Sequence, residues 1–317
     1  MTHRRPATEA IVEWYDRKTE FLLEKYGPGP RVHYHTGWAA PDIVPAADRS
    51  GLRRQLWCSQ EDMIRQAARA WCGEENLTGD LLDVGCGLGG TSIFFAVELG
   101  SHVTALSPVA RHLEWVARFA QQAGVRERVQ PLLGDAHALE GPARFDAAFS
   151  FDATTYFDRE SYFESVARVV RAGGWVFIED TFLGRPELAA PFNEYWTTNI
   201  GWAHDYVAAA LQHGFDLFRL EDISRHSAGF WKLSVAYSRL LAEGRPASIE
   251  WQSAIHAAYL DGGLRNLLLS FRKRSPRLDS RTSGEHRTRP GEVEEHGARA
   301  RAVARPNGER GRHTPCF

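Results

Sequence analysis

The chain has 317 residues, of which 43% are hydrophobic, so it can bury one large α/β core and still carry extensions. Its 38 Lys and Arg residues nearly balance its 40 Asp and Glu residues, which argues against nucleic acid or an anionic membrane as partner and favours a small-molecule substrate. The four cysteines form no CxxC pair and have no histidines at zinc spacing, so we expect reduced thiols and no metal site.

The N-terminal part predicts an amphipathic helix followed by a loop. It lacks the apolar run of a signal peptide, and no later stretch is long enough to span a membrane, so we expect a cytoplasmic protein. Residues 8–26 carry apolar side chains at helical intervals, namely Ile11, Trp14, Tyr15, Phe21 and Leu22. Glycines and prolines at 27–30 end this helix and begin a loop rich in aromatic and histidine side chains, which could cover a pocket. A second helix is expected over 60–72.

Five short apolar segments alternate with helical patterns from residue 81 onward. We predict strands over 81–84, 103–106, 129–133, 145–149 and 175–178. Strands that alternate with helices form parallel βαβ units, with helices on both faces of the sheet. The pattern therefore predicts a Rossmann-like α/β fold.

The pattern changes after Glu179, where aromatic residues become frequent. Residues 189–207 place rings three or four residues apart, which predicts one face of a single helix that carries Phe192, Tyr195, Trp196, Trp202 and Tyr206. Strands over 215–223 and 264–271 would close the sheet as an antiparallel edge.

Composition divides the chain into three parts. We expect an N-terminal helix and its loop over 1–55, one catalytic domain over 56–273, and a charged, disordered tail over 274–317. The tail has almost no large apolar residue, so it cannot bury enough surface to fold. Acidic residues interspersed with its basic ones argue against nucleic acid binding.

The strongest local signal is segment 83–90, Asp-Val-Gly-Cys-Gly-Leu-Gly-Gly, between a predicted strand and a predicted helix. Glycines there let the backbone turn tightly and approach a ligand closely. A dinucleotide is the main competing ligand, but its fingerprint reads G-x-G-x-x-G, whereas this segment reads D-x-G-x-G-x-G. The second predicted strand also ends in Leu106 and Ser107, without the acid that binds a dinucleotide's ribose.

This segment, together with Asp135 after the third strand, resembles the class I S-adenosylmethionine (SAM)-dependent methyltransferases. The resemblance implies a seven-stranded, mostly parallel sheet with N-terminal helices and an aromatic lid region, and SAM as the cofactor, which is converted to S-adenosylhomocysteine. It implies that Asp83 orients the turn and the methionine ammonium, and that Asp135 accepts a hydrogen bond from the adenine amino group. Asp135 could also be a simple turn residue. The implied cofactor contacts further include Gln60, Gly85, Cys86, Gly87, Leu106, Ser107, Ala136 and Phe151.

The region expected to hold the methyl acceptor is rich in rings, since residues 149–259 contain 21 of the chain's 36 aromatic side chains. The span 60–273 is similar to the geranyl diphosphate C-methyltransferase family and its relatives, including the teleocidin-type indole alkaloid methyltransferases. The similarity is carried by SFDATTYFD, FNEYWTTNIGWAHDYV, GFWKL, AYLDGGLRNLLLSF and the early HYHTG. Asp152 stands where the family's prenyl diphosphate enzymes have Glu, which leaves the substrate open between a prenyl diphosphate and an uncharged prenylated compound.

The resemblance implies methylation of an alkene carbon in a terpenoid or prenyl side chain, which leaves a carbocation. Asp152 would accept a neighbouring proton or guide cyclisation. Rings that would shield and stabilise the cation are Phe151, Tyr156, Trp196, Trp202 and Trp231. Alternatively, Asp152 caps the helix expected near Arg159 or holds the Thr154–Thr155 turn, and the rings only pack a core.

His33 and His35, in the N-terminal loop, are candidate acids, bases or head-group ligands, and surface positions without a catalytic role are the competing explanation. O- or N-methylation of a small natural product, with one of these histidines or Asp152 as base, remains an alternative function. A binding protein that uses SAM only to stabilise its fold is disfavoured by the intact glycine turn. Mg²⁺ is expected only for a diphosphate acceptor, which Arg49, Arg53 and Arg54 could hold. Relatives favour a homo-oligomer formed through the N-terminal helix.

Overall fold

The computed structural model describes residues 8–71, 73–241 and 246–275, so the predicted tail lies outside the described residues from position 276 onward. The strands are β1 (Asp80–Val84), β2 (His102–Ser107), β3 (Val129–Leu133), β4 (Phe145–Phe151), β5 (Val170–Leu183), β6 (Phe215–Asp222) and β7 (Leu264–Lys273). The α-helices are α1 (Thr8–Tyr26), α2 (Arg49–Ala70), α3 (Gly90–Glu98), α4 (Ala110–Gln122), α5 (Arg159–Val169), α6 (Ala189–Trp196), α7 (Ala203–Gln212), α8 (Ser224–Leu241) and α9 (Pro246–Leu260). Short 3₁₀ turns are η1 (Glu74–Leu77), η2 (Thr154–Tyr156) and η3 (Pro186–Leu188).

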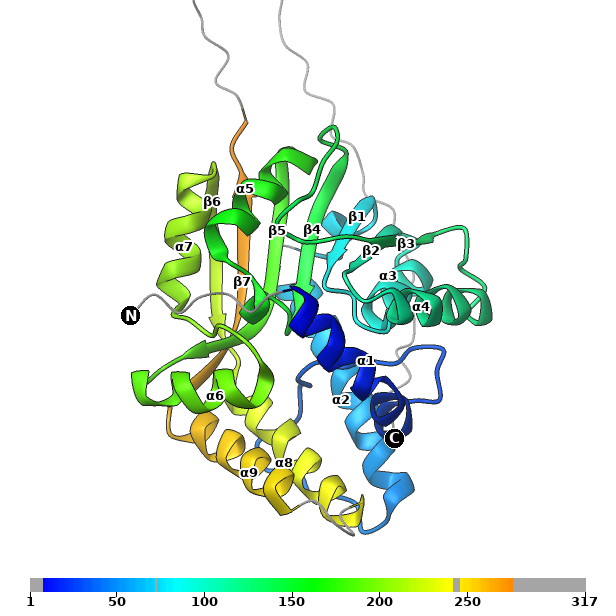
Figure 1. Ribbon diagram of the computed structural model, residues 1–317, viewed down its shortest axis with the longest axis vertical. Helices are drawn as coiled ribbons and strands as arrows, with labels where there is room; N and C mark the ends of the chain where they lie inside the picture. The colour runs from blue at the N-terminus through cyan, green and yellow to red at the C-terminus, as the bar shows by residue number, and fades with distance from the viewer. Residues whose placement is uncertain (1–7, 72, 242–245, 276–317) are drawn as a thin grey trace, which may run out of the picture. The chain divides into compact units, whose positions relative to one another are not determined.

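The described strands form one seven-stranded sheet in the order β3-β2-β1-β4-β5-β7-β6 (Figure 1). The strands β1 to β5 pair in parallel, and β7 pairs antiparallel with both β5 and β6. This confirms the predicted Rossmann-like, mostly parallel sheet with an antiparallel edge. The carboxyl ends of the parallel strands meet at one edge of the sheet, and Figure 1 shows α1, α6, α8 and α9 beyond that edge.

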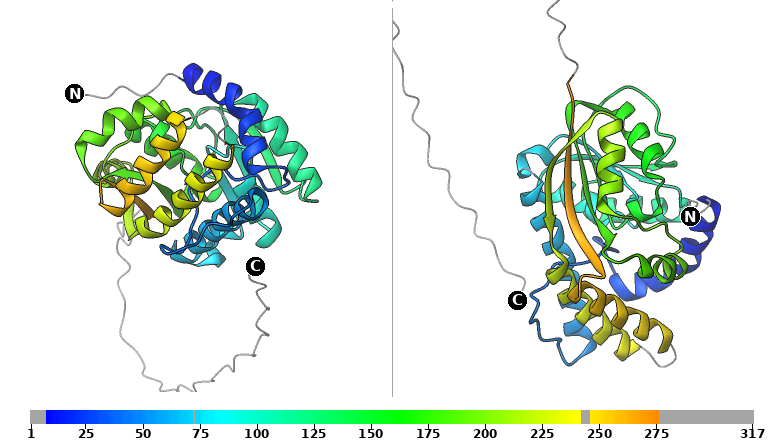
Figure 2. Two further views of the ribbon diagram at one scale, coloured as in Figure 1. Left: turned by 90° about the horizontal axis from the view of Figure 1, so that it is seen from below. Right: turned by 90° about the vertical axis from the view of Figure 1, so that its left-hand side faces the viewer.

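Helices cover both faces of the sheet, because successive strand side chains point to opposite sides. Leu82 of β1 packs in a cluster with Phe163 of α5, whereas its neighbour Leu81 packs in a cluster with Met63 of α2. The right-hand view of Figure 2 shows the sheet between these two layers of helices. Full burial of one such side chain contributes about 1.5–3 kcal/mol to stability. The layered core therefore supports the carboxyl edge on which the site is built.

The structure corrects the start of the second helix, which was predicted at Gln60. Helix α2 begins at Arg49, because the Asp48 side chain accepts a hydrogen bond from the Gly51 N–H at 2.9 Å and caps the helix there. Helix α2 therefore continues through residues 55 and 56, between which the sequence predicted the boundary of the N-terminal part and the catalytic domain. The predicted end at Cys72 lies outside the described residues.

The single aromatic helix predicted over 189–207 is wrong, because the chain forms α6 and α7 with an irregular link between them. Thr197 adopts the left-handed conformation, with φ of 57°. The Asn193 side chain accepts hydrogen bonds from the Ile200 N–H at 2.7 Å and the Thr198 hydroxyl at 3.1 Å, so it stabilises the link instead of a continued helix. Trp202 therefore stands at the N-cap of α7 and shares no helix face with the rings of α6.

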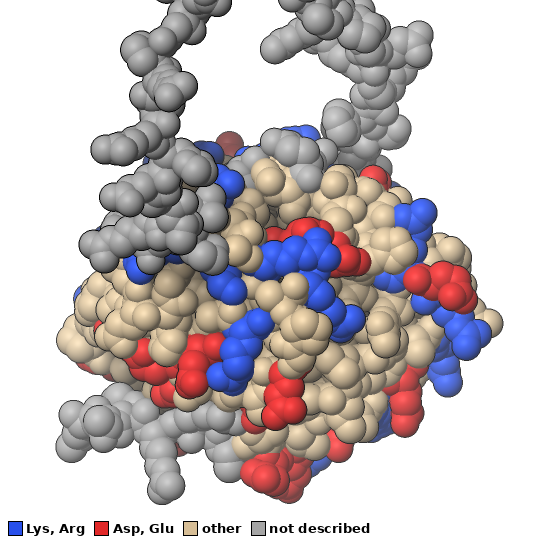
Figure 3. Space-filling model, turned by 90° about the horizontal axis from the view of Figure 1, so that it is seen from above, with Lys and Arg blue, Asp and Glu red and all other residues tan. Residues whose placement is uncertain are grey.

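Acidic and basic side chains are interspersed over the face of the molecule seen in Figure 3. At the amino ends of β1, β4 and β5, Arg171 pairs with Asp80 at 3.4 Å and with Asp146. Exposed pairs of this kind contribute little to stability. Among the described residues visible in Figure 3, no broad patch carries charges of one sign. Among the helices that the structure describes, none combines the length and hydrophobicity needed to cross a bilayer.

Candidate active site

The turn after β1 depends on glycine backbone geometry. The N–H groups of Gly85 and Cys86 both donate to the Leu106 carbonyl, at 3.0 and 2.9 Å, which fixes the turn beside the end of β2. Gly85 and Gly87 have φ of 88° and 52°, in the left-handed region that favours glycine. A Cβ at Gly87 would face open space, whereas one at Gly85 would lie 2.6 Å from the Ala153 Cβ. The turn thus presents bare backbone to the space beside it.

The space beside this turn, which we call the glycine-turn cavity, has an empty volume of about 740 Å³, including its open mouth. It lies at the carboxyl ends of β1, β2 and β4, where open α/β sheets bind ligands. Seven predicted cofactor residues line it: Gly85, Gly87, Leu106, Ser107, Asp135, Ala136 and Phe151. Thr8 and Ile11 of α1 and His112 of α4 also line it, although the sequence did not indicate them. Helix α1 therefore covers part of this cavity.

Asp135 lies on the wall of the glycine-turn cavity, just after β3. One carboxylate oxygen accepts hydrogen bonds from the His137 N–H at 3.0 Å and from the His137 ring, and the other accepts from the Thr8 hydroxyl at 2.9 Å. Burial alone would raise the pKa of Asp135, but these hydrogen bonds hold it well below its usual range. The Asp135 carboxylate is therefore ionised at neutral pH and can accept hydrogen bonds from a ligand.

Three predicted cofactor residues do not line the glycine-turn cavity. The Asp83 carboxylate accepts a 2.6 Å hydrogen bond from the Ser92 hydroxyl, and burial raises its pKa to about 7. The Cys86 side chain packs in a hydrophobic cluster. The Gln60 amide donates to the carbonyls of His33 at 3.2 Å and His35 at 2.9 Å, so it holds the N-terminal loop in place. Their contacts support the turn and the loop.

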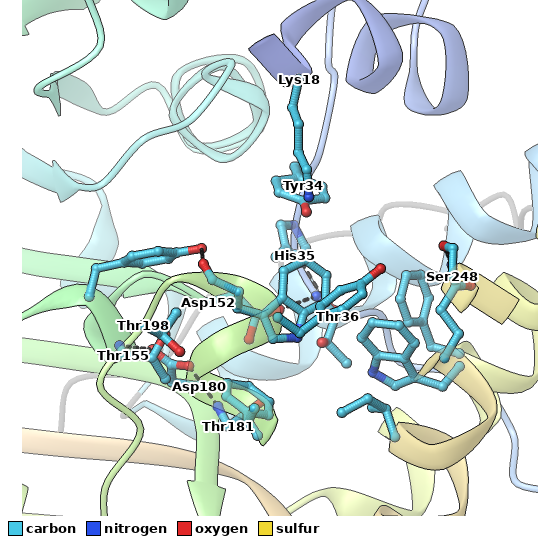
Figure 4. Close-up of a pocket in the computed structure, with 18 of the residues that line it drawn as sticks. Lys18, Tyr34, His35, Thr36, Asp152, Thr155, Asp180, Thr181, Thr198 and Ser248 are labelled. Atoms are coloured by element: carbon cyan, nitrogen blue, oxygen red, sulfur yellow. Dashed lines mark hydrogen bonds between the residues drawn. The ribbon is translucent and has the colours of Figure 1, made fainter. Parts of the chain in front are cut away.

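A second space, which we call the aromatic cavity, has an empty volume of about 910 Å³, including its mouth (Figure 4). Apart from the residues that it shares with the glycine-turn cavity, the side chains with rings that line it are Phe21, Tyr26, His35, Phe192, Tyr195, Trp196, Phe230, Trp231 and Tyr259. Tyr15, Tyr34, Asp152 and Tyr156 line both cavities, so ligands bound in the two spaces would meet at these four residues. Both volumes match those of small-molecule sites.

Asp152 is held at this junction in a conformation rare for a non-glycine residue, with φ of 46°. Its carboxylate accepts a hydrogen bond from the Thr36 N–H at 2.5 Å, and its own N–H donates to the Glu179 carbonyl at 2.9 Å. These contacts come from the N-terminal loop and from β5. Strained residues that tertiary contacts hold in place occur preferentially at functional sites.

Two other carboxylates cap helix α5 and hold the Thr154–Thr155 turn, the structural roles that the sequence left open for Asp152. Asp158 caps α5 by accepting from the Ser161 N–H at 2.9 Å. Asp180 holds the next turn by accepting from the Thr154 N–H at 2.6 Å. Burial raises the pKa of both Asp152 and Asp180, and the charge of Asp152 raises that of Asp180 further. The aromatic cavity therefore contains two carboxyl groups with a raised affinity for protons, of which Asp180 is buried and Asp152 is partly buried.

His33 and His35 are buried, so the surface positions considered for them are wrong. His33 lines neither cavity, and its Nε2 lies 3.4 Å from a carboxylate oxygen of Glu61. His35 lines the aromatic cavity, and its Nδ1 lies 2.8 Å from the Thr36 carbonyl. Burial lowers the pKa of His35 to about 3, so its ring is neutral at physiological pH.

Of the rings predicted to stabilise a carbocation, most line a cavity and one does not. Tyr156, Trp196 and Trp231 line the aromatic cavity, whereas Trp202 lines neither cavity because the break after α6 redirects it. Within the described residues, the buried indole N–H of Trp231 has no hydrogen-bond partner.

Sequence reasoning missed Lys18, Lys25 and Asp180, which also line the aromatic cavity. Asp180 follows a predicted strand closely, so its place at the carboxyl edge was a usable signal. In Figure 4, Lys18 reaches from α1 toward Tyr34. No cluster of three or more His, Cys, Asp or Glu side chains in the described residues could hold a metal ion.

Comparison with known proteins agrees with this geometry. Residues 81–174, which run from the second residue of β1 to the first residues of β5, match the family model described as a methyltransferase domain. A chloroplastic tocopherol O-methyltransferase of Arabidopsis thaliana is 25% identical over 242 residues, which cover 70% of this chain and 67% of that protein.

Solved structures share the whole fold. A geranyl diphosphate methyltransferase in complex with GPP and sinefungin has a TM-score of 0.74 at 19% identity, covering 84% of this chain and 98% of that one. The geranyl diphosphate C-methyltransferase of Streptomyces coelicolor A3(2), in complex with Mg²⁺, geranyl diphosphate and S-adenosyl-L-homocysteine, has a TM-score of 0.67 at 18% identity, with coverages of 84% and 97%. Residues 81–174 therefore form a methyltransferase domain, and the sheet order and the glycine turn are those expected of a SAM-dependent enzyme of this kind.

Proposed function

We propose that this enzyme methylates an alkene carbon in a terpenoid or prenyl side chain of a natural product. The observation that carries the proposal is the junction of the two cavities, where the partly buried carboxyl group of Asp152 faces an aromatic-walled space. Ring faces and carboxylates attract positive charge, and apolar walls accommodate a hydrocarbon chain. The similar structures of geranyl diphosphate methyltransferases support this choice of acceptor, as does the resemblance to teleocidin-type enzymes.

The residues of the glycine-turn cavity fit SAM. Gly85 and Gly87 offer bare backbone under a ligand, and the ionised Asp135 offers an acceptor for an amino group. When bound, SAM supplies an electrophilic methyl group together with one positive charge. Helix α1 and the shared tyrosines then separate this reactive group from bulk water.

The chain's own residues must control the positive charge that methylation leaves on an alkene. The rings of Tyr156, Trp196 and Trp231 can each stabilise a cation by about 0.5–2 kcal/mol through their faces. Asp152, in its ionised form, stabilises the same charge and accepts the proton whose loss restores an alkene. Retention of the cation between these groups would instead allow cyclisation.

O- or N-methylation is the second candidate function. A similar curated protein is an O-methyltransferase, and the raised pKa of Asp152 suits it to accept a proton from a hydroxyl group. The two functions differ in the bond that forms to the new methyl group.

The test is product analysis with isotopically labelled SAM and a panel of prenyl diphosphates, prenylated indoles and prenylated quinones. Mass spectrometry detects methyl transfer, and carbon connectivity by NMR locates the new bond. We expect a new carbon–carbon bond in the prenyl part. Label found only on oxygen or nitrogen would replace the proposal with the second candidate.

Asp152→Asn tests the residue that carries the proposal. Asparagine keeps an acceptor for the Thr36 N–H, so the variant should fold and bind SAM, while turnover falls by roughly 100-fold or the products shift among alkene isomers and cyclised forms. Asp158→Asn is the matched control, because Asp158 caps α5 and lines neither cavity. A fully active Asp152→Asn enzyme with unchanged products would remove Asp152 from the mechanism.

A further inference from the structure

The aromatic cavity has opposite chemical character at its two ends. Asp152 and Asp180 lie at the end that adjoins the glycine-turn cavity. Figure 4 shows both on one side of the space and Ser248 of α9 on the other. Ser248 belongs to a polar group that includes Lys25 of α1, so the far end carries a cation. Rings line the walls between the two ends.

Lys25 is a buried cation for which the described residues provide no carboxylate. Its side chain lines the aromatic cavity, the residue is 4% exposed, and the described ion pairs include none with it. Its Nζ donates to the Ser234 hydroxyl at 3.2 Å, which uses one of three N–H donors. Burial, and then the charge of Lys18, lowers the pKa of Lys25 to about 8, so it remains mostly protonated at neutral pH. A buried ammonium without a counter-ion is costly unless a ligand supplies the negative charge.

The groups around Lys25 form an ordered polar pocket. Ser234 and Ser238 both donate to the Gln252 side-chain oxygen, at 3.0 and 2.9 Å. The Gln252 amide donates to the Ser248 hydroxyl at 3.0 Å. Because the Ser234 hydroxyl proton is directed to Gln252, Ser234 is fixed as an acceptor for Lys25. Gln252 and Ser248 line the cavity with Lys25, so the ammonium is held in place at its wall.

Helix α1 sets the distance between this pocket and the reaction centre. Thr8 and Ile11 line the glycine-turn cavity, Tyr15 lines both cavities, and Lys18 and Lys25 line only the aromatic cavity. Tyr15 and Lys25 are ten residues apart on one continuous helix, which corresponds to about 15 Å at the rise of an α-helix. An anionic group bound at Lys25 would therefore lie several bonds away from an atom at the junction.

We propose that the acceptor is an amphiphile whose anionic group, a carboxylate or a phosphate, binds Lys25 at the far end of the aromatic cavity while a remote carbon lies at the junction with the cofactor. This inference rests on the proposed function for the reaction, but the binding that it describes is independent of methyl transfer. It places the methylated carbon far from the anionic group. Positive charge develops at the acidic end of the cavity, and the fixed negative charge of the ligand stays at the basic end.

Binding is measured by quenching of tryptophan fluorescence, since Trp196 and Trp231 line the cavity. The probes are farnesyl phosphate, farnesoic acid and the neutral farnesol, which share one hydrocarbon chain. We expect the wild-type protein to bind both anions at least about tenfold more tightly than farnesol, as a charge-assisted contact predicts. Lys25→Met should abolish this preference while leaving the affinity for farnesol within about twofold, and Lys25→Arg should retain most of it.

Lys232→Met is the matched control, because Lys232 of α8 lines neither cavity and should leave all affinities unchanged. Lys25→Met should fold at least as well as the wild type, because it removes a buried charge, and a melting curve checks this. Equal binding of the alcohol and the anions by the wild type, or an anion preference that survives Lys25→Met, would overturn the inference. Anion-selective binding that depends on Lys25, with methyl groups found only on oxygen, would overturn the proposed function but leave the anion-binding role of Lys25 intact.

Discussion

Asp83→Asn should stabilise the cofactor-free protein and weaken cofactor binding at the same time. Asp83 is 2% exposed, and burial raises the pKa of its carboxyl group from 3.8 to about 7. At about 1.36 kcal/mol per pKa unit, this rise corresponds to about 4 kcal/mol against the ionised form in the folded state. Asparagine keeps an acceptor for the Ser92 hydroxyl and has no charge, so it avoids this cost.

The stability difference must depend on pH with a defined sign. Because the folded-state pKa is raised, the stabilisation by protonated Asp83 is complete below about pH 4 and is lost as pH rises toward 7. Between pH 5 and pH 8, the melting temperature of Asp83→Asn should therefore rise relative to the wild type by roughly 5 °C, or about 2–3 kcal/mol. Comparing the two proteins at each pH cancels the titration of all other groups.

The cofactor side of the prediction is measured by calorimetry with SAM at pH 8. Asp83 does not line the cavity, so loss of its charge should weaken binding through the glycine turn that it supports, by about 1 kcal/mol, the usual net value of one hydrogen bond. Asp80→Asn is the matched control, since Asp80 lies at the exposed start of the same strand. A pH-independent difference in melting temperature would refute the burial argument, and unchanged SAM affinity would refute the role in cofactor binding.

Three further predictions concern the cavities and the tail. Asp135→Ala should weaken SAM binding by about 1.5–3 kcal/mol in calorimetry, because it removes the ionised acceptor on the cavity wall, and an unchanged affinity would contradict that assignment. Trp196→Phe should alter the product distribution by mass spectrometry, whereas Trp202→Phe should not, because only Trp196 lines the aromatic cavity; equal effects would count against the proposed acceptor site. Deletion of 276–317 should leave the melting temperature and turnover intact, since the segment has few large apolar residues, and a large drop in melting temperature would show that it contributes to the fold.

Much of the fold was predictable because its signals are local. The third strand was predicted over 129–133, which are the residues of β3, and the predicted first helix has the bounds of α1. Hydrophobic periodicity and turn residues act over a few neighbours, so they can be recognised without knowledge of the packing. The prediction of one aromatic helix was wrong because periodicity reports only local spacing. The break after Trp196 depends on hydrogen bonds to the Asn193 side chain, which periodicity does not show.

The candidate site was only partly predictable. Asp135 was selected on the family resemblance, and Asp152 was selected on the resemblance and because it follows the fourth predicted strand, at the carboxyl edge of the sheet. The burial of His33 and His35 could not be predicted, since it depends on how the N-terminal loop packs against α2. The proposed roles of the site residues and the homo-oligomer expected through α1 remain predictions.

The sequence by itself determined the five parallel strands and the glycine turn, because each depends on residues close together in the chain, and the resemblance carried by the glycine turn and Asp135 implied the type of cofactor. Only the tertiary structure decided which side chains share a cavity. Lys25 and Ser248 are 223 positions apart in the chain, yet both line the aromatic cavity, and Asp152 faces that cavity because Thr36 and β5 hold it there. The physical reason is that long-range packing sets the direction of a side chain, and no local pattern encodes that packing.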